Sequence, residues 1–338
     1  MSGYTTHDQQ AMVSVISGHF VSQMARTLAE LRIPDLLHDQ PRSAKEIADA
    51  AGTHPEATRR LMRCAVYTGL AAFSDDTENF SSTPLLDRLR ADAPDSLRSL
   101  AIAWNSPGHW KQWERLPDAV RAGHEQSKAA HGKPIWEYFA ENPGEADLFS
   151  QGAAELTAPV VREAISSIPT TPGDVVVDVG GATGTFVLEM LERHQGTTGV
   201  VFDLPHVMDA AKQTIADRGL AQRCSAESGD FFTSVPEGDL YLLKFILHDW
   251  DDDACVTVLE RCRAAMKPSG RIVIVDMVIG PPATPGSAAL MDLNMLSMTE
   301  GHERELADLD RIFAAAGLRR STTTALAEPY FAVEAVAV

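Results

Sequence analysis

The sequence predicts an α/β protein in which a parallel β-sheet flanked by helices follows a mainly helical N-terminal region. In the second half of the chain, short runs rich in valine and isoleucine alternate with segments of helix length, a pattern typical of consecutive β-α-β units. In the first third, apolar residues recur at three- and four-residue spacing, as on one face of a helix. We therefore expect a helical domain over residues 1–95, a helical connector over 96–165, and the sheet-containing domain over 166–338.

A long first helix is predicted over residues 10–37. Its apolar positions are Val13, Ile16, Phe20, Met24 and Leu28. Ser43 with Glu46 has the spacing of a capping box, which predicts the start of a second helix. Thr53 with Glu56 repeats this spacing and predicts a third helix.

A small hairpin is predicted next, because two short β-prone runs within residues 70–82 flank a polar turn. Helices followed by such a hairpin indicate a winged-helix-like domain. Arg59, Arg60 and Arg63 favour DNA binding by this domain, but the acidic residues 75–78 in the hairpin oppose it. A packing or dimerisation module is the preferred interpretation, and a DNA-binding regulator is the alternative from another class.

Charge and hydropathy narrow the range of partners. The chain has 338 residues, of which 29 are Lys or Arg and 47 are Asp or Glu, so the formal net charge is −18. This charge opposes binding to phosphate backbones and to anionic lipid surfaces. No apolar run approaches the roughly 20 residues of a membrane span, and the first ten residues are polar rather than signal-like. We expect a cytoplasmic protein without nucleic-acid or membrane partners.

The cysteines and histidines do not form a recognisable ligand set. Cys64 and Cys224 are isolated, whereas Cys255 and Cys262 lie two helical turns apart on an apolar stripe, so we expect reduced cysteines. The 11 histidines are scattered, and we expect no metal site.

A glycine-rich turn follows the first strand of the predicted sheet. Residues 175–179 form the strand and residues 185–193 form a helix. Gly180, Gly181 and Gly184 lie between them. Small residues let the backbone approach a ligand closely. A nicotinamide-binding loop or an ordinary tight turn would look similar, so the loop alone leaves the cofactor open.

Acidic residues at the ends of successive strands narrow the choice of cofactor. Asp178 can order the loop and receive the cationic amino end of S-adenosylmethionine, whereas a pyrophosphate gains nothing from it. Asp203 closes the next strand, 199–203, and can accept both ribose hydroxyls of a nucleoside cofactor, NAD included. Asp230 and Phe231 then offer a carboxylate for an adenine amine and an aromatic face for its ring. Each acid alone could be a solvated strand-end residue, but their order favours S-adenosylmethionine.

Five segments carry a resemblance to a known family. They are Asp178–Gly184, Asp203-Leu204-Pro205, Gly229–Phe232, Lys244–Trp250 and Gly301–Arg304. They resemble the class I S-adenosylmethionine-dependent small-molecule O-methyltransferases, which include plant phenolic enzymes and bacterial natural-product enzymes. The likeness covers nearly the whole chain, because the winged-helix-like region resembles the N-terminal dimerisation domain of that family.

The resemblance implies a Rossmann-like fold, S-adenosylmethionine as methyl donor, S-adenosylhomocysteine as product, and a homodimer formed through the N-terminal domain. The helix over residues 13–28 is expected to cover part of the partner's active site. From the strand-end pattern and the resemblance together, the expected cofactor-binding residues are Asp178, Gly180, Gly181, Gly184, Asp203, Leu204, Asp230, Phe231, Lys244 and Trp250. Ala182 departs from the glycine of many relatives, and its methyl group is expected to fit only if the local φ is negative.

His248 is the candidate general base. A phenol ionises near pH 10, so methyl transfer at neutral pH benefits from a histidine beside the acceptor hydroxyl. His248 ends the predicted strand 240–247, at the edge where open α/β sheets hold ligands. By resemblance, Asp276 and Glu303 orient this histidine, although Asp276 could instead cap a turn and Glu303 could be surface charge. We expect activity to depend on a group that titrates around pH 6–7, shifted by whatever Asp276 and Glu303 contribute.

Two groups of residues are candidates for the substrate pocket. A helix over residues 288–299 resembles the substrate-lining helix of the family, and core packing is the alternative. Its candidates are Met291, Asn294, Met295 and Met298. The connector over 96–165 is expected to contribute the second group, which is Trp104, Asn105, His109, Trp110 and Phe149.

The function predicted from these observations is methylation of a phenolic hydroxyl on a small aromatic natural product. Four alternatives remain open at this point. On the same scaffold, they are an N- or C-methyltransferase and an S-adenosylmethionine-binding decarboxylase or hydroxylase. From other classes, they are an S-adenosylmethionine-sensing DNA-binding regulator and an NAD-dependent dehydrogenase.

Overall fold

A computed structural model describes residues 6–338. Contacts between residues divide the chain into two compact units, which are described separately. The N-terminal unit comprises residues 1–110 and 142–156, and the sheet unit comprises residues 111–141 and 157–338. Residues 96–165, expected as one helical connector, are helical over most of their length and are divided between the two units.

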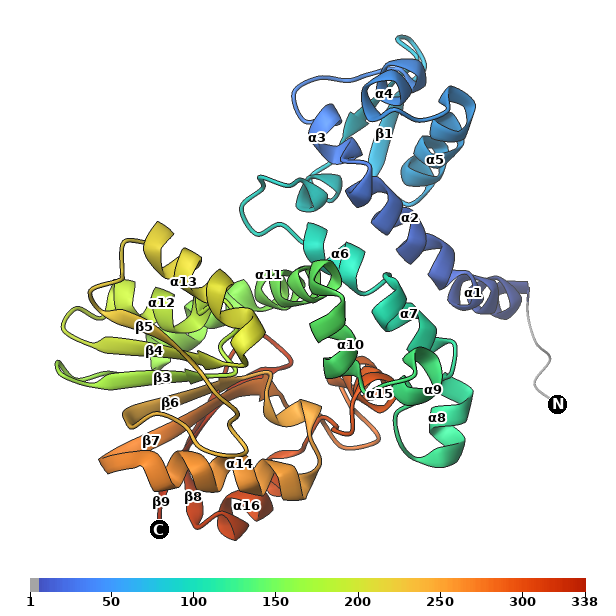
Figure 1. The fold of residues 1–338 in the computed structure, drawn as a ribbon. Coiled ribbons are helices and arrows are strands. Elements are labelled where there is room, and N and C mark those ends of the chain that lie inside the picture. Colours follow the sequence, from blue (N-terminus) through green and yellow to red (C-terminus); the bar gives the residue numbers. More distant parts are fainter. Residues whose placement is uncertain (1–5) are drawn as a thin grey trace. The chain divides into compact units, whose positions relative to one another are not determined.

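The N-terminal unit consists of short helices and one hairpin (Figure 1). Its elements in chain order are α1 (Thr6–Ile16), α2 (Gly18–Glu30), α3 (Ile33–Leu37), α4 (Ala44–Ala51), α5 (Pro55–Tyr67), β1 (Ala71–Ser74), β2 (Asn79–Ser82), η1 (Leu86–Leu89), α6 (Arg98–Ala103), the start of α7 (Pro107–Trp113) and the first part of α11 (Pro143–Ser167). The predicted hairpin is confirmed, because β1 pairs with β2 in antiparallel fashion. The single predicted first helix is instead three helices.

One of the two predicted capping boxes forms. The Ser43 side chain accepts from the backbone N–H of Glu46, whose carboxylate accepts from the N–H of Ser43. The predicted Thr53 and Glu56 box is wrong, because α5 begins one residue later with His54 as its N-cap. The Thr53 hydroxyl instead lies 2.6 Å from the hydroxyl of Thr58.

The sheet unit is built on a seven-stranded sheet in the order β5-β4-β3-β6-β7-β9-β8. The strands are β3 (Val175–Val179), β4 (Thr198–Asp203), β5 (Cys224–Ser228), β6 (Gly238–Lys244), β7 (Met266–Met277), β8 (Leu318–Ala325) and β9 (Tyr330–Ala337). The first five are parallel, as predicted, and β9 pairs antiparallel with both β7 and β8. The last two strands were not predicted from the sequence.

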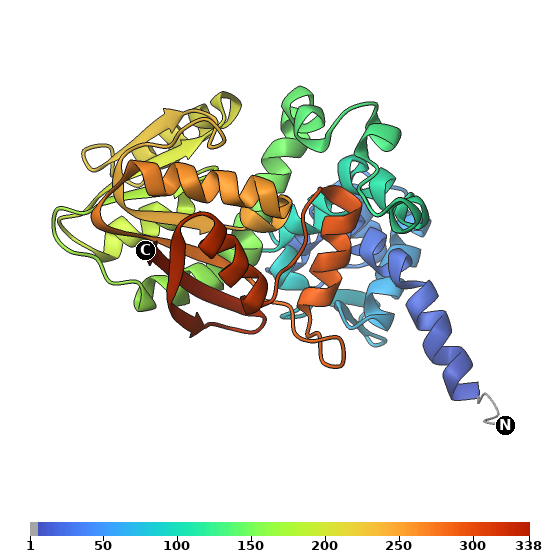
Figure 2. The same ribbon diagram turned by 90° about the horizontal axis from the view of Figure 1, so that it is seen from below.

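Helices cover both faces of this sheet. In Figure 1, α12 (Thr185–Arg193) and α13 (Met208–Asp217) lie above the strands, and α14 (Asp252–Ala265) and α16 (Leu306–Ala315) lie below them. Figure 2 shows α14 and α16 from their own side, in front of the strands. The core beneath α14 contains Cys255 and Cys262, both fully buried, which confirms them as core cysteines.

The remaining elements of the sheet unit connect these layers. They are α8 (Leu116–Ala122), α9 (Ser127–His131), α10 (Ile135–Glu141), η2 (Pro205–Val207), η3 (Leu247–Asp249) and α15 (Ala288–Met298). The direction in which successive strands are added to the sheet reverses at β3. Strands β4 and β5 extend the sheet on one side of β3, and β6 and β7 extend it on the other side. Open α/β sheets bind ligands at the carboxyl ends of strands beside such a reversal.

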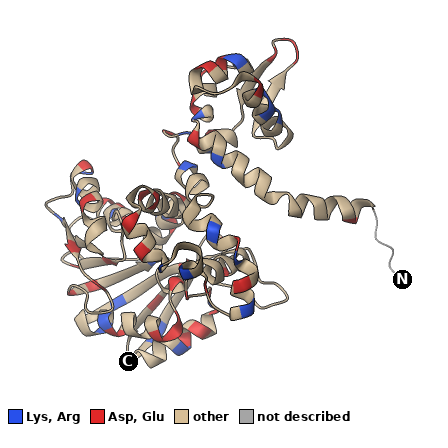
Figure 3. Ribbon diagram, turned by 45° about the vertical axis from the view of Figure 1, so that its right-hand side comes forward, with Lys and Arg blue, Asp and Glu red and all other residues tan. Residues whose placement is uncertain are grey.

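Charged side chains of both signs are interspersed on each unit (Figure 3). Within residues 6–338, no helix combines the length and the apolar character that a bilayer span needs. In the same part of the chain, no three His, Cys, Asp or Glu side chains are grouped as metal ligands.

Candidate active site

The glycine-rich loop between β3 and α12 lies against its neighbours with almost no free space. A Cβ added to Gly180 would overlap the side chain of Ile246, and one added to Gly181 would lie 2.8 Å from Cγ of Asp178. The Asp178 carboxylate accepts from the backbone N–H of Val187 on α12, at 3.3 Å. Burial raises the pKa of Asp178 to about 6. Asp178 therefore ties the loop to the helix that follows it, as its position at the strand end predicted.

Ala182 lies in the same loop with a φ of +49°, so the condition under which its methyl group was expected to fit, a negative φ, is not met. A non-glycine residue in this region is strained by about 1–2 kcal/mol. The conformation is held by a 2.9 Å hydrogen bond that the Ala182 N–H donates to the Asp203 carboxylate. The loop therefore keeps a left-handed geometry that glycine adopts more readily than alanine.

Asp203 ends β4 beside this loop. Its other oxygen accepts from the backbone N–H of Leu204 at 2.6 Å. Burial raises the pKa of Asp203, and the hydrogen bonds from Leu204 and Ala182 oppose that increase. The carboxylate thus joins the ends of two neighbouring strands, where a ribose would lie in a nucleoside-binding fold of this type.

An aromatic cluster lies on the next loops. The Phe231, Phe232 and Trp250 rings pack edge to face, with centroids 4.7–6.0 Å apart. Trp136 of α10 stacks on Trp250 at 6.4 Å and 28°, a contact that sequence reasoning missed because 114 residues separate the two rings. Asp230 accepts from the backbone N–H of Phe232 at 2.9 Å. These rings offer apolar faces of the kind that a purine base occupies.

Lys244 is the last residue of β6 and is partly exposed. Burial lowers the pKa of its ammonium group, and the carboxylates of Asp178 and Asp276 oppose this effect. The lysine is thus positioned between the glycine-rich loop and the carboxyl end of β7.

His248 does not end a strand, contrary to the prediction. Strand β6 ends at Lys244, and His248 lies in the 3₁₀ turn η3. The physical reason is Phe245, whose φ of +55° turns the backbone out of the extended conformation. The histidine is nevertheless at the carboxyl edge of the sheet, next to the strand reversal.

Three carboxylates surround the His248 imidazole. Oε1 of Glu303 lies 2.8 Å from Nδ1, and Oδ1 of Asp249 lies 3.7 Å from Nε2. Asp276, near the end of β7, is buried close enough to raise the pKa of the imidazole. Among the described residues, Oδ1 of Asp276 and Oε2 of Glu303 have no hydrogen-bond partner. Asp249 was not predicted, although it directly follows His248 in a segment that the sequence analysis had singled out.

The imidazole and the carboxylates around it change one another's pKa values. Burial acts to lower the pKa of His248, but Asp249, Glu303 and Asp276 outweigh it and raise that pKa to about 9. Burial raises the pKa of Asp276 to about 7, despite the opposing effect of His248. The expected titration near pH 6–7 therefore does not fit His248 in this environment.

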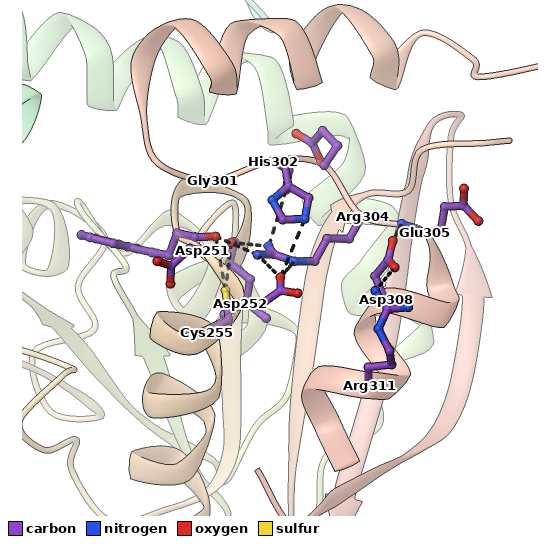
Figure 4. A network of polar contacts seen from close by, with 12 residues as sticks. Asp251, Asp252, Cys255, Gly301, His302, Arg304, Glu305, Asp308 and Arg311 are labelled. Atoms are coloured by element: carbon purple, nitrogen blue, oxygen red, sulfur yellow. Dashed lines mark hydrogen bonds and ion pairs between the residues drawn. The ribbon is translucent and has the colours of Figure 1, made fainter. Parts of the chain in front are cut away.

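Arg304, whose guanidinium group lies beside Asp252 in Figure 4, holds the backbone that carries His248. Its guanidinium group donates to the carbonyl oxygens of Leu247 and Trp250, each at 2.7 Å. It also donates to Oδ1 of Asp252 at 2.9–3.0 Å, which links it to the start of α14. Arg304 is buried and so is its hydrogen bond to Leu247, whereas Asp252 is partly exposed. Arg304 thus fixes both ends of the turn that carries His248. The preceding residue, Glu303, contacts the imidazole of the same histidine.

Gly301 packs directly on the same turn. A Cβ at this position would overlap backbone atoms of His248, Asp249 and Trp250. Its neighbours are held too, because Thr299 accepts from the Gly301 N–H and Asp292 accepts from the Glu303 N–H. Glu303 was the predicted site residue of this segment. The roles of Gly301 and Arg304 were not predicted.

The predicted pocket residues fall in both units. On α15 of the sheet unit, Met291, Met295 and Met298 are buried, and Oδ1 of Asn294 accepts from Nε1 of Trp113 at 2.9 Å. The opposite face of α15 lines an open cavity of about 790 Å³, with Ala289, Leu293 and Leu296 among its walls. The methionines therefore do not face this cavity.

The five other candidates lie in the N-terminal unit. They are Trp104, Asn105, His109, Trp110 and Phe149. Nδ2 of Asn105 donates to the carbonyl oxygen of Ala101 at 3.0 Å, and the His109 ring lies 5.8 Å from that of Phe149. Burial lowers the pKa of His109 to about 4, so this histidine is neutral at physiological pH.

The fold and these side chains define a protein that binds a nucleoside-bearing cofactor beside a buried histidine. Residues 113–319 match the model of the O-methyltransferase domain, and residues 13–91 match that of the O-methyltransferase dimerisation domain. The chain therefore belongs to the S-adenosylmethionine-dependent O-methyltransferase family.

Relatives in sequence and structure agree with this assignment. The mitomycin biosynthesis 6-O-methyltransferase of Streptomyces lavendulae is 30% identical over 92% of this chain and 89% of its own length. The phenazine O-methyltransferase PhzM of Lysobacter antibioticus is 31% identical over 90% and 89%. The crystal structure of LaPhzM matches with a TM-score of 0.91 at 30% identity, covering 98% of this chain and 99% of that one.

Proposed function

We propose that this O-methyltransferase methylates a phenolic hydroxyl of a small aromatic natural product and that His248 removes the acceptor's proton. The observation that supports the base most directly is the buried hydrogen bond between Nδ1 of His248 and Glu303. Nε2 is the nitrogen proposed to face the acceptor, since Asp249 lies 3.7 Å from it, beyond hydrogen-bonding distance. Aromatic acceptors are supported by relatives named for mitomycin and phenazine methylation.

The residues around the glycine-rich loop fit S-adenosylmethionine, which supplies an electrophilic methyl group. Glycines 180 and 181 let the loop pack tightly against Ile246 and Asp178, because a Cβ at either position would overlap those side chains. Asp203 would accept the ribose hydroxyls, and the Phe231 and Trp250 rings would enclose the adenine. Asp178 would order the loop, and the remaining expected contacts are Gly184, Leu204, Asp230 and Lys244.

The carboxylates around His248 make its imidazole a stronger base. Proton transfer from a phenol with a pKa near 10 to an imidazole with an ordinary pKa of 6.5 costs about 4.8 kcal/mol. With the His248 pKa at about 9, the same transfer costs about 1.4 kcal/mol. His248 is therefore mostly protonated in the resting protein at pH 7. Its imidazole must lose this proton before it can accept one from the acceptor hydroxyl.

The predicted pocket residues are proposed to align the acceptor molecule for methyl transfer. Methyl transfer is an in-line displacement, so the protein must hold the acceptor oxygen in a fixed direction. Within the sheet unit, we propose the buried methionines of α15 as an apolar wall. Trp104, Asn105, Trp110 and Phe149 of the N-terminal unit are proposed separately as substrate contacts. Asn294 is already engaged by Trp113, so it acts by orienting that ring.

Nitrogen methylation is a second candidate activity. The 8-amino-8-demethylriboflavin N,N-dimethyltransferase of Streptomyces davaonensis is 32% identical over 86% of this chain. A neutral aromatic amine does not need a strong base, whereas a phenol does. The buried acid–histidine group therefore favours a hydroxyl acceptor. Incubation with S-adenosylmethionine and a panel of phenols and aromatic amines, with S-adenosylhomocysteine release as the readout, tests this preference, and turnover of amines alone would contradict it.

Replacing Asp203 with alanine is expected to lower the affinity for S-adenosylmethionine at least tenfold. Two ribose hydroxyls lose a charged acceptor, each hydrogen bond contributing about 1.5–3 kcal/mol at most. The strained loop also loses the hydrogen bond from Ala182. Titration calorimetry measures the effect, with Asp209→Ala on exposed α13 as the control. A change below threefold would show that Asp203 does not hold the ribose.

The N-terminal helix is the expected dimer contact. None of the residues of α1 is buried, and its exposed apolar residues include Val15 at 74% and Ile16 at 65%. Figure 3 shows that α1 and α2 carry few charges. The dimerisation-domain match begins at residue 13, so a second copy of the chain is the proposed partner, with this helix covering part of its active site.

Substituting Val15 and Ile16 with aspartate is expected to convert the dimer to a monomer, because two charges would be buried at the interface. Analytical ultracentrifugation at micromolar concentration measures the change. Val120→Asp on α8, also an exposed apolar position at 61%, is the matched control and should leave the dimer intact. A wild-type monomer, or a double variant that still dimerises, contradicts this interface.

A further inference from the structure

Phe245 has a backbone conformation that its residue type disfavours. It directly follows β6 and has a φ of +55°, in the left-handed region that bulky residues seldom adopt. Its N–H donates to the carbonyl oxygen of Val275 at 3.2 Å, so the strained residue is anchored to β7. Strain of this kind persists where the surrounding structure fixes it, and it is common at functional sites.

This conformation places the Phe245 ring flat against His248. The two ring centroids are 4.7 Å apart and the planes differ by 25°. On β9, the buried Tyr330 ring lies 5.8 Å from Phe245 at 29°, so Phe245 forms a stack with both rings. An extended residue at this position would direct its side chain elsewhere and lose the contact with the imidazole.

The stack supplies a second restraint beside the hydrogen bond to Glu303. Rotation about the terminal side-chain torsion, which is intrinsically broad, displaces Nδ1, so the hydrogen bond limits this rotation to the range that hydrogen-bond geometry tolerates. A ring face in contact restricts that rotation. The aromatic face also attracts a cation, so it favours the protonated imidazole.

We propose that Phe245 is a positioning residue for the His248 base, holding the imidazole plane and stabilising its protonated form. This inference rests on the proposed role of His248. The other charged groups that face the imidazole are Asp249 on its own turn, Glu303 on the loop before α16 and Asp276 on β7. On β6, the Lys244 ammonium lies 5.6 Å from the Phe245 ring centre.

Three substitutions separate stacking from backbone strain. Phe245→Trp retains an aromatic face. Phe245→Asn removes the ring but suits the left-handed backbone better, so it relieves strain. Phe245→Leu removes the ring and retains the strain. If Phe245 only filled space, stability and activity would change together across the series.

The first measurement is the pKa of His248 in the resting protein, from an NMR titration of the imidazole. We expect Phe245→Asn to lower this pKa by about 0.5–1.5, which is the range of a cation–π contact converted to pKa. Phe245→Trp is expected to keep the pKa or raise it. An unchanged pKa in Phe245→Asn overturns the stabilising role of the ring.

The second measurement is kinetic. We expect Phe245→Asn to lower kcat at least tenfold while its melting temperature is unchanged or higher and its affinity for S-adenosylmethionine stays within twofold. Phe73→Leu removes a ring from a similar pair, Phe73 with Phe80, in the hairpin and should leave kcat and the His248 pKa unchanged. Wild-type kcat in Phe245→Asn, or equal losses of stability and cofactor affinity, overturns the positioning role.

Failure of this inference is distinguishable from failure of the proposed function. If His248→Ala is inactive while Phe245→Asn behaves as wild type, only the role of Phe245 is wrong. If His248→Ala retains full activity, the proposed base is wrong, whatever the Phe245 series shows.

Discussion

Substitution of His248 with alanine is expected to lower kcat by roughly 10²–10⁴, the usual contribution of a positioned general base. Affinity for S-adenosylmethionine should change less than twofold, because Gly180, Asp203 and Asp230, which are proposed to hold it, lie on other elements than the turn that carries His248. Single-turnover kinetics isolate the chemical step from product release. Exposed His54 of the N-terminal unit provides a control, and its replacement with alanine should leave kcat within twofold.

The pH dependence of this variant is equally diagnostic. In the wild type, kcat/KM should rise with pH up to about 9, because the imidazole is a base only when neutral and its carboxylate neighbours raise its pKa. In His248→Ala, the rate should continue to rise towards pH 10, since the phenol must ionise unaided. A nitro-substituted, more acidic derivative of the acceptor should restore much of the variant's activity. A wild-type profile that is flat between pH 6 and 9 contradicts the raised pKa.

Substitution of Gly301 with alanine is expected to lower kcat about 100-fold without abolishing cofactor binding. The added methyl group would overlap backbone atoms of the His248 turn, and backbone cannot move aside as a side-chain tip can. The turn must shift, which disturbs the hydrogen bonds from Arg304 and the contact with Glu303. A displacement near 1 Å at a reacting centre can cost about 100-fold.

The backbone angle of Gly301 makes this test specific. Gly301 is not among the positive-φ residues, so alanine meets a steric obstacle there and not a conformational one. The matched control is Gly144→Ala on α11, where the added Cβ has open space around it. Wild-type kcat in Gly301→Ala, with a crystal structure that shows an unmoved turn, would refute the close packing described for this loop.

Local sequence patterns predicted the cofactor loop well. The strand over residues 175–179 and the helix over 185–193 have the bounds that the sequence predicted, because an apolar run, a glycine cluster and an amphipathic segment each act over a few residues. Strands β8 and β9 were missed. Strand β8 is an edge strand rich in Arg, Ser and Thr, and its apolar pattern is therefore weak.

The environment of His248 depended on contacts that spacing does not encode. The imidazole pairs with Glu303 across 55 residues, and its ring stack involves Phe245, whose positive φ no local pattern announces. That same φ explains why a continuous strand was wrongly extended to Leu247. The raised pKa of His248 follows from three acids brought together by different elements, so composition and motif order could not have predicted it.

Methyl-transfer chemistry at oxygen is the central claim, and the fate of a labelled methyl group tests it most directly. S-adenosylmethionine carrying a ¹³C methyl group is incubated with the enzyme and a phenol that the acceptor panel identifies, and the product is examined by NMR. We predict that the label appears as an aryl methyl ether, with one S-adenosylhomocysteine released per methyl group transferred, and that formation of the ether is strongly reduced in His248→Ala. Label on nitrogen or carbon, or no transfer from a bound cofactor to any acceptor, would contradict the account.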